Sequence, residues 1–119
     1  LAALPGCAAL ALGAGTLVAH QAFVADDSYE VLFKADADRA FAIARGVFED
    51  LDPAARVSPE DRRIEGRYEG ASLEVEVDHE SRGYSRLVVE ARRYQLAAQG
   101  TAKSVAERIA RRVNEGGPG

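Results

Sequence analysis

The chain has 119 residues, enough for one domain, with 15 Lys and Arg against 19 Asp and Glu and a net charge of −4. This mildly acidic balance disfavours bulk electrostatic binding to nucleic acid, which requires a basic surface, and it also disfavours polybasic attachment to a membrane. The single cysteine, Cys7, excludes a disulfide within the chain, so apolar packing alone must hold the fold.

The first 25 residues are uncharged and rich in Ala and Gly. Within them Leu4-Pro5-Gly6-Cys7 resembles the lipobox of bacterial lipoproteins, in which an aliphatic residue stands three before an obligatory cysteine and a small residue just before it. In that class the thiol carries a diacylglyceryl group and the signal is cut before the cysteine. Cys7 is therefore the predicted lipidation site, although Pro5 departs from the usual residue. Residues 1–25 are expected to comprise a signal remnant, the lipobox and a membrane tether.

Other interpretations of this segment remain open. A transmembrane helix over Ala8–Ala25 would be short for a bilayer, which needs about 20 predominantly apolar residues, and it would contain His20 and Gln21. An ordinary cleaved signal would leave His20 or Phe23 at the −3 position, where small residues are required. A fourth interpretation is a plain soluble domain whose Cys7 is incidental.

In a lipoprotein, Ala8 after the cysteine favours export to the outer membrane.

The charged part, residues 26–115, reads as a small α+β domain. Alternation over Tyr29–Ala35 predicts a strand, and Asp36 is the expected N-cap of a helix that stops at Asp52-Pro53. The spacing of apolar residues gives this helix one buried face, formed by Ala40, Phe41, Ala44, Val47, Phe48 and Leu51.

Three more strands follow, over Arg62–Tyr68, Leu73–Val77 and Leu87 to about Tyr94. Glu69-Gly70 and Gly83 mark the turns between them. Thr101 is the expected cap of a last helix, and residues 116–119 are expected to form a disordered tail. The buried stripe of this helix comprises Ala102, Val105, Ala106, Ile109 and Val113.

The order β-α-β-β-β-α predicts a two-layer α+β sandwich, with a mostly antiparallel four-stranded sheet and two helices on one face. The first strand could pair beside the second or the fourth. The opposite face of the sheet should face solvent and carry charges of both signs, namely Arg63, Glu65, Arg67, Glu74, Glu76 and Asp78.

The residues that could carry chemistry are few. His79 stands between Asp78 and Glu80, and a carboxylate can orient an imidazole, but a solvated turn histidine is the simpler interpretation because His20 is the only other histidine. No catalytic residue, metal ligand or cofactor is predicted. The doublets Arg62-Arg63, Arg92-Arg93 and Arg111-Arg112 could meet lipid head groups or an acidic partner, or be ordinary surface charge.

The chain resembles an uncharacterised family of small bacterial lipoproteins, a domain of unknown function. The segments that carry this resemblance are the final helix, GCAALALGAG at 6–15, YEVLFKADADRAFAIA at 29–44 and RRIEGRYEGASLEVEV at 62–77. It implies a lipoprotein that faces the periplasm, and it transfers no catalytic residues.

Together, sequence and resemblance predict a non-catalytic accessory or binding module. It would be held by a lipid on Cys7 in the inner leaflet of the outer membrane, with an envelope protein as a partner. Two alternatives remain. One is a single-pass structural protein that oligomerises through a Gly/Ala helix, and the other is a small envelope enzyme that uses His79.

Overall fold

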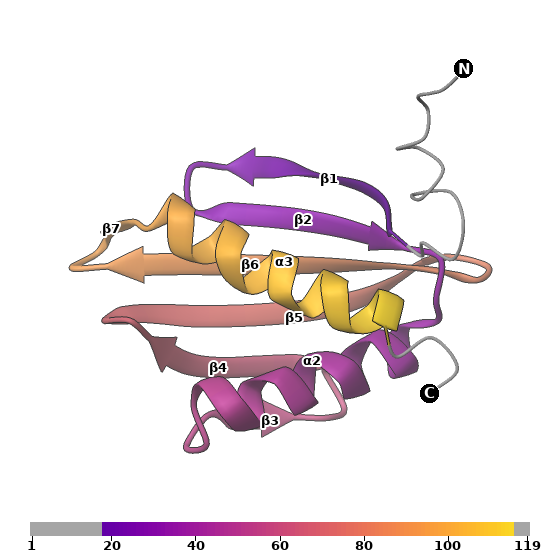
Figure 1. Ribbon diagram of the computed structural model, residues 1–119, viewed down its shortest axis with the longest axis horizontal. Coiled ribbons are helices and arrows are strands. Elements are labelled where there is room, and N and C mark those ends of the chain that lie inside the picture. Colours follow the sequence, from indigo (N-terminus) through magenta and orange to yellow (C-terminus); the bar gives the residue numbers. More distant parts are fainter. Residues whose placement is uncertain (1–17, 116–119) are drawn as a thin grey trace.

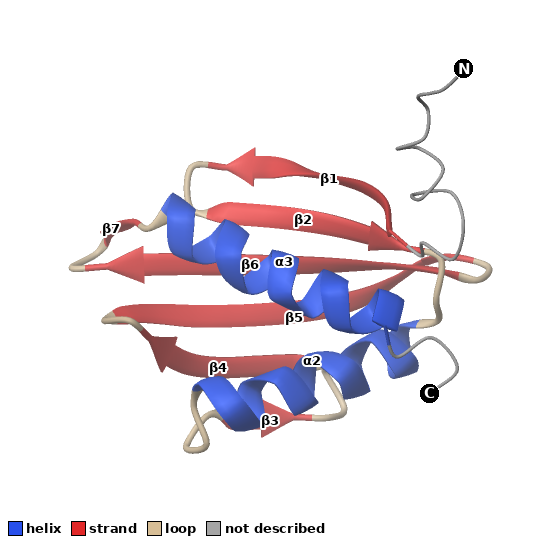
Figure 2. Ribbon diagram, in the orientation of Figure 1, coloured by secondary structure: helices blue, strands red, loops and turns tan. Residues whose placement is uncertain are grey.

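Two helices cover one face of a seven-stranded sheet in the computed structural model, which describes residues 18–115 (Figures 1 and 2). The strand order is β1-β2-β6-β5-β4-β3, β7 pairs with β6, and every pairing is antiparallel. The predicted α+β class, with two helices and an antiparallel sheet, is confirmed. The elements are β1 Val18–Ala25, β2 Ser28–Phe33, α2 Ala37–Leu51, β3 Arg56–Ser58, β4 Arg63–Tyr68, β5 Ala71–Ser81, β6 Tyr84–Arg93, β7 Leu96–Ala97 and α3 Gln99–Glu115.

The prediction of four strands is wrong, because β1, β3 and β7 also join the sheet. β3 and β7 have only three and two residues, too few for any alternation to be visible. β1 runs VAHQAFVA, without a regular alternation of apolar and polar residues. It pairs with β2, so the sheet begins on the N-terminal side of the boundary expected at Asp26. Cys7 and the expected tail at 116–119 lie outside the described residues.

β2 lies between β1 and β6, so the first predicted strand pairs with the fourth. The chain leaves β2 through α2, reaches the far edge at β3, and returns through the β4-β5-β6 meander. Tyr29 then stands opposite Val89, and Val31 opposite Leu87. These side chains point to the helical layer, which fixes the register because a slip of one residue would turn them to solvent.

Both helices have the apolar faces that the sequence predicts. Asp36 caps α2 by accepting a hydrogen bond from the Arg39 N–H at 2.9 Å, as expected. α3 begins at Gln99, so the expectation that Thr101 caps it is wrong. Thr101 is instead buried in the first turn, where its hydroxyl accepts a hydrogen bond from Arg93 at 3.1 Å.

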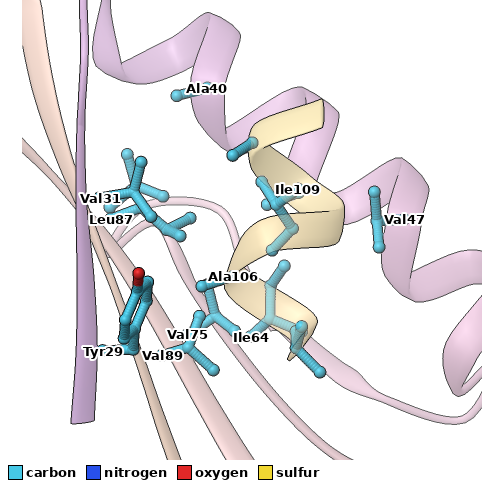
Figure 3. Close-up of a cluster of buried hydrophobic side chains, with 14 of the residues drawn as sticks. Tyr29, Val31, Ala40, Val47, Ile64, Val75, Leu87, Val89, Ala106 and Ile109 are labelled. Atoms are coloured by element: carbon cyan, nitrogen blue, oxygen red, sulfur yellow. The ribbon is translucent and has the colours of Figure 1, made fainter. Parts of the chain in front are cut away.

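The core lies between the two layers and draws side chains from the sheet and from both helices (Figure 3). Phe33, Phe48, Ile64, Leu87 and Ile109 are among its largest fully buried side chains. Fully buried alanines stand on both helices, and their small side chains let the helices approach the sheet closely. The helical alanines without exposed surface are Ala40 and Ala44 on α2 and Ala102 and Ala106 on α3. With no disulfide in the described residues, this packing is the main source of stability.

Two hairpin turns place both central residues in the left-handed region. Glu69 and Gly70 have φ of 53° and 81°, and Tyr94 and Gln95 have φ of 56° and 64°. Each turn joins strands through a two-residue loop, the geometry that favours Asn-Gly. The first turn meets this preference with Gly70, whereas the second contains no glycine and no asparagine.

Replacing Tyr94-Gln95 by Asn-Gly should therefore raise the free energy of unfolding by about 1 kcal/mol, because left-handed geometry costs an ordinary residue roughly that much. Tyr94 is 89% exposed, so little packing is lost. Urea unfolding measures the change. Glu69→Asn, in the turn that already has its glycine, is the matched control and should change stability less. Equal or lower stability of the Asn-Gly variant would contradict the strain argument.

Candidate functional site

The sheet face opposite the helices, here called the outer face, carries charged side chains from neighbouring strands. The burial pattern of β4 and β5 turns the predicted charged residues to this face, as expected. β6 adds Arg86, Glu90 and Arg92, which the sequence analysis did not include. Alternation along the predicted strand could have found them, because they alternate with the apolar residues Leu87, Val89 and Ala91.

The strand register places three glutamates side by side on the outer face. Glu74 of β5 stands directly opposite Glu65 of β4 on one side and Glu90 of β6 on the other. We call these three residues the glutamate row. Like charges directly opposite one another destabilise a sheet. One step along the strands, Arg67, Ser72 and Arg92 form a parallel row. An acidic row therefore lies beside a row that carries two arginines.

Arginines partly neutralise the glutamate row from its two sides. Arg63 Nε lies 3.2 Å from Glu74, and its Nη2 donates to Glu76 at 3.2 Å. Arg92 Nε lies 3.6 Å from Glu90, and Arg56 Nη2 lies 3.8 Å from Glu65. These side chains are mostly more than a third exposed, so each pair contributes at most about 1 kcal/mol. Compensation of the glutamate row is therefore weak.

At the end of the row, the carboxyl group of Glu90 interacts with that of Asp27. Asp27, buried in the β1–β2 turn, accepts hydrogen bonds from the Ser28 hydroxyl and from Arg92 Nε, both at 2.9 Å. The Ser28 hydrogen bond lowers the pKa of Asp27, although burial opposes it, and Glu90 and Arg92 lower it further. Burial raises the pKa of Glu90, and Asp27 and Glu74 raise it further. On acidification Glu90 therefore takes up a proton before Asp27.

A groove of about 600 Å³ lies on this face. The glutamate row lines it, together with Arg67, Ser72 and Arg92 and part of the α2–β3 loop. The groove thus offers carboxylates and guanidinium groups of three adjacent strands within one open concavity. Ligand sites on proteins are commonly concave, with a few convergent polar groups that set orientation.

Asp52 forms the rim of the groove from the α2–β3 loop. Its Oδ2 accepts the Arg67 N–H at 2.8 Å and its Oδ1 accepts the Ala54 N–H at 3.0 Å. β3 pairs with β4 only as far as Glu65, so the Asp52 carboxylate takes the place of a neighbouring strand for Arg67. A Cβ on Gly66 would lie 2.9 Å from Asp52 Oδ2, so only glycine leaves room for this contact.

The histidine singled out by sequence has no supporting geometry. His79 lies on β5 opposite Ser85, and Asp78 lies opposite Arg86, so the two neighbours project to opposite faces of the strand. Both are exposed. The His79 side chain has no hydrogen-bond or ion-pair partner among the described residues. The structure therefore does not bring Asp78 and His79 together.

The arginine doublets are mainly engaged within the chain. Arg62 Nε lies 2.9 Å from Asp38, Arg63 pairs with Glu74 and Glu76, and Arg92 pairs with Asp27 at 2.8 Å. Arg93 Nη2 donates to the Glu69 carbonyl at 2.8 Å and to Thr101. Arg62, Arg63 and Arg92 are thus each paired with a carboxylate of the same chain. Arg93 instead ties the β4–β5 turn to α3.

The described residues, 18–115, include neither a membrane-spanning helix nor a cluster of metal ligands. Neither helix in this range combines the length and the apolar character that crossing a bilayer requires. The same range holds no group of three His, Cys, Asp or Glu side chains placed to bind a metal ion. Comparison with models of protein families, with curated proteins and with solved structures found no match to this chain.

Glu90→Gln should stabilise the fold at neutral pH and have little effect in acid. A carboxyl whose pKa is raised on folding binds protons more tightly in the folded state, so stability falls as pH rises through the window above the ordinary value of 4.5. Glutamine does not titrate, so the variant does not lose this stability as pH rises. Urea unfolding at about pH 7 and about pH 4 measures the difference.

Asp27→Asn is the matched variant, and its effect on stability at neutral pH should be opposite to that of Glu90→Gln. The lowered pKa of Asp27 means that its charge stabilises the fold above the ordinary value of 3.8, and that this stability is lost as pH falls. The variant should therefore be destabilised at neutral pH and approach the wild type in acid. The same sign of effect for both variants at neutral pH would contradict this division of roles.

Asp52→Ala should lower the free energy of unfolding by about 1–2 kcal/mol, because it leaves the Arg67 and Ala54 N–H groups without their acceptor. Asp50→Ala is the control, since Asp50 is exposed on α2 two residues earlier and should change stability by less than about 0.5 kcal/mol. Thermal and urea unfolding report both. Indistinguishable effects would show that the Asp52 contacts do not hold the rim.

Proposed function

We propose that the chain is a lipid-anchored, non-catalytic binding module of the bacterial envelope, tethered through Cys7 and facing the periplasm. The observation that carries the proposal is the groove of about 600 Å³ on the outer face, with the glutamate row along it. A row of like charges costs stability wherever no partner neutralises it. Such an arrangement is easier to explain on a surface that receives a partner than on one that only meets water.

The charges indicate the chemistry of the partner. A basic group over Glu65, Glu74 and Glu90 would relieve their mutual repulsion, and an adjacent acidic group could face Arg67 and Arg92. A protein segment that carries both signs meets this requirement. Complementary potentials of this kind give specificity and speed of association more than raw affinity. A partner protein of the envelope, with mixed charge at its contact surface, is the kind of ligand that we propose.

The anchor at Cys7 rests on the sequence motif. Ten residues, 8–17, separate Cys7 from the start of β1, and that length spans at most about 35 Å when fully extended. A module on such a tether would stay close to the membrane, so its partner would be at the membrane surface or would reach it. Two or three acyl chains are sufficient for stable anchoring. The inner leaflet of the outer membrane remains the proposed location.

The two alternatives have less support. A spanning Gly/Ala helix over Ala8–Ala25 would need Val18–Ala25, which pair with β2 as a strand. An enzyme based on His79 has less support because Asp78 projects to the other face of β5 and Glu80 is paired with Arg86 at 2.8 Å. Neither alternative uses the groove.

Mass spectrometry of the mature N-terminus, after membrane fractionation, tests the anchor. In bacteria that express the precursor, wild type should begin at an acylated Cys7 and sediment with membranes. Cys7→Ser should lose the acyl mass and leave the membrane fraction. An unmodified cysteine with residues 1–25 still attached would reject the lipoprotein assignment and leave the groove to be tested separately.

Photocrosslinking in the bacterial envelope tests the outer face. A benzophenone amino acid at Ser72, exposed in the groove, should form a discrete adduct, whereas the same group at Lys103 on α3 should not. Adding Glu74→Gln to the Ser72 probe should weaken the adduct several-fold, because it breaks the glutamate row. Equal adducts from both probe positions, or none from Ser72, would reject the outer face as the binding surface.

A further inference from the structure

The two edges of the sheet are built very differently. β3 is three residues long, and the Asp52 carboxylate occupies the β4 edge beyond it. β1 forms the opposite edge (Figure 1). It is eight residues long and contains no charge and no proline. No described residue pairs with the outer side of β1. Long uncharged edges without proline are surfaces on which further strands add, and most proteins protect them.

β1 also exposes apolar side chains at its C-terminal end. Phe23 is 43% exposed and Val24 is 54% exposed. Phe23 stands opposite Tyr29, and the two rings meet edge to face with 4.8 Å between their centroids. Because Tyr29 points into the core, Phe23 lies on the helical side of the sheet. Its ring continues the apolar inner layer of the sheet onto the edge strand, where it stays partly exposed to solvent.

A groove lies beside the other end of the same strand. It has a volume of about 530 Å³ and runs between β1 and α3. Val18, Ala19 and Gln21 line it from the strand, and Glu107, Ala110 and Arg111 line it from the helix. The edge strand therefore presents an exposed aromatic side chain at one end and an unfilled, partly apolar groove at the other.

We propose that a second copy of this chain docks on β1, antiparallel to it, about a twofold axis perpendicular to the sheet. Antiparallel pairing brings the end of one β1 beside the beginning of the other, so Phe23 of each copy lies over the groove at Val18–Gln21 of its partner. The same surface then supplies both halves of the contact, as an isologous dimer requires. The two sheets become one, with α2 and α3 of both copies on the same side of it.

The charges beside the groove agree with self-association. Glu107 and Arg111 lie one helical turn apart on α3, so each copy presents both signs at the edge of the contact. In a twofold dimer, Glu107 of one copy can meet Arg111 of the other, so the contact does not bring only like charges together. The outer face is not used, so dimerisation leaves the groove at the glutamate row open. This inference is therefore independent of the proposed function.

Sedimentation equilibrium of the full chain in mild detergent, in a Cys7→Ser background that excludes an intermolecular disulfide, tests the proposal. We expect a reversible monomer–dimer equilibrium. Ala19→Glu, at an exposed position of β1, and Phe23→Glu should each raise the dissociation constant at least about tenfold, because a charge at an edge opposes strand addition. The matched control Ser58→Glu, on β3 at the other edge, should leave it unchanged.

Circular dichroism and the thermal midpoint verify that each variant is folded. Should Phe23→Glu unfold through loss of the Tyr29 contact, Ala19→Glu carries the test alone. Hydrogen exchange of the β1 amides provides a second readout, since those that face away from β2 should be protected in the dimer and exposed in Ala19→Glu. A chain that is monomeric at every concentration, or a dimer that Ala19→Glu and Ser58→Glu affect equally, would overturn the proposal.

Discussion

The pairing of β2 with β6 is the contact on which the rest of the molecule depends. It joins the first part of the domain to the last strand of the meander, and it sets Val31 against Leu87 and Tyr29 against Val89. α3 packs over this pair of strands, and the register of β6 then fixes that of β5 and β4 in turn. In a small domain without an internal disulfide, this pairing and the packing of α3 on β2 and α2 hold distant segments of the chain together. Both grooves lie in positions set by this pairing.

Local patterns in the sequence predict most of the elements, because each depends on neighbours within a few residues. Alternation around Val31 and Val75 and the helical spacing around Phe48 are signals of this kind, and so is Gly70 in its turn. β1 carries no alternation, because as an edge strand it has no buried face of its own. Thr101 resembles a cap in sequence, yet it lies inside α3, where Arg93 donates to its hydroxyl. These two errors come from tertiary context.

The candidate site could be predicted only in its residue types. Charged residues on the outer strand face follow from alternation, but their arrangement does not. Glu65, Glu74 and Glu90 become neighbours through two strand pairings, and no property of the separate segments specifies that register. The role of Asp52 is equally hidden, because it depends on β3 stopping short of Arg67. Pairings between distant segments place the groove, and these are what a single sequence leaves undetermined.

Asp52 links the two layers of the molecule around the edge of the sheet. Its N–H donates to the Phe48 carbonyl at 2.9 Å and so ends α2, while its carboxylate holds the Arg67 N–H beside the groove. Phe48 is itself 2% exposed, within the core. Asp52 therefore belongs both to the C-terminal cap of α2 and to the rim of the groove on the outer face. Moving the end of β4 away from Asp52 would break the contact with Arg67, so the rim of the groove depends on a residue that the end of α2 holds in place.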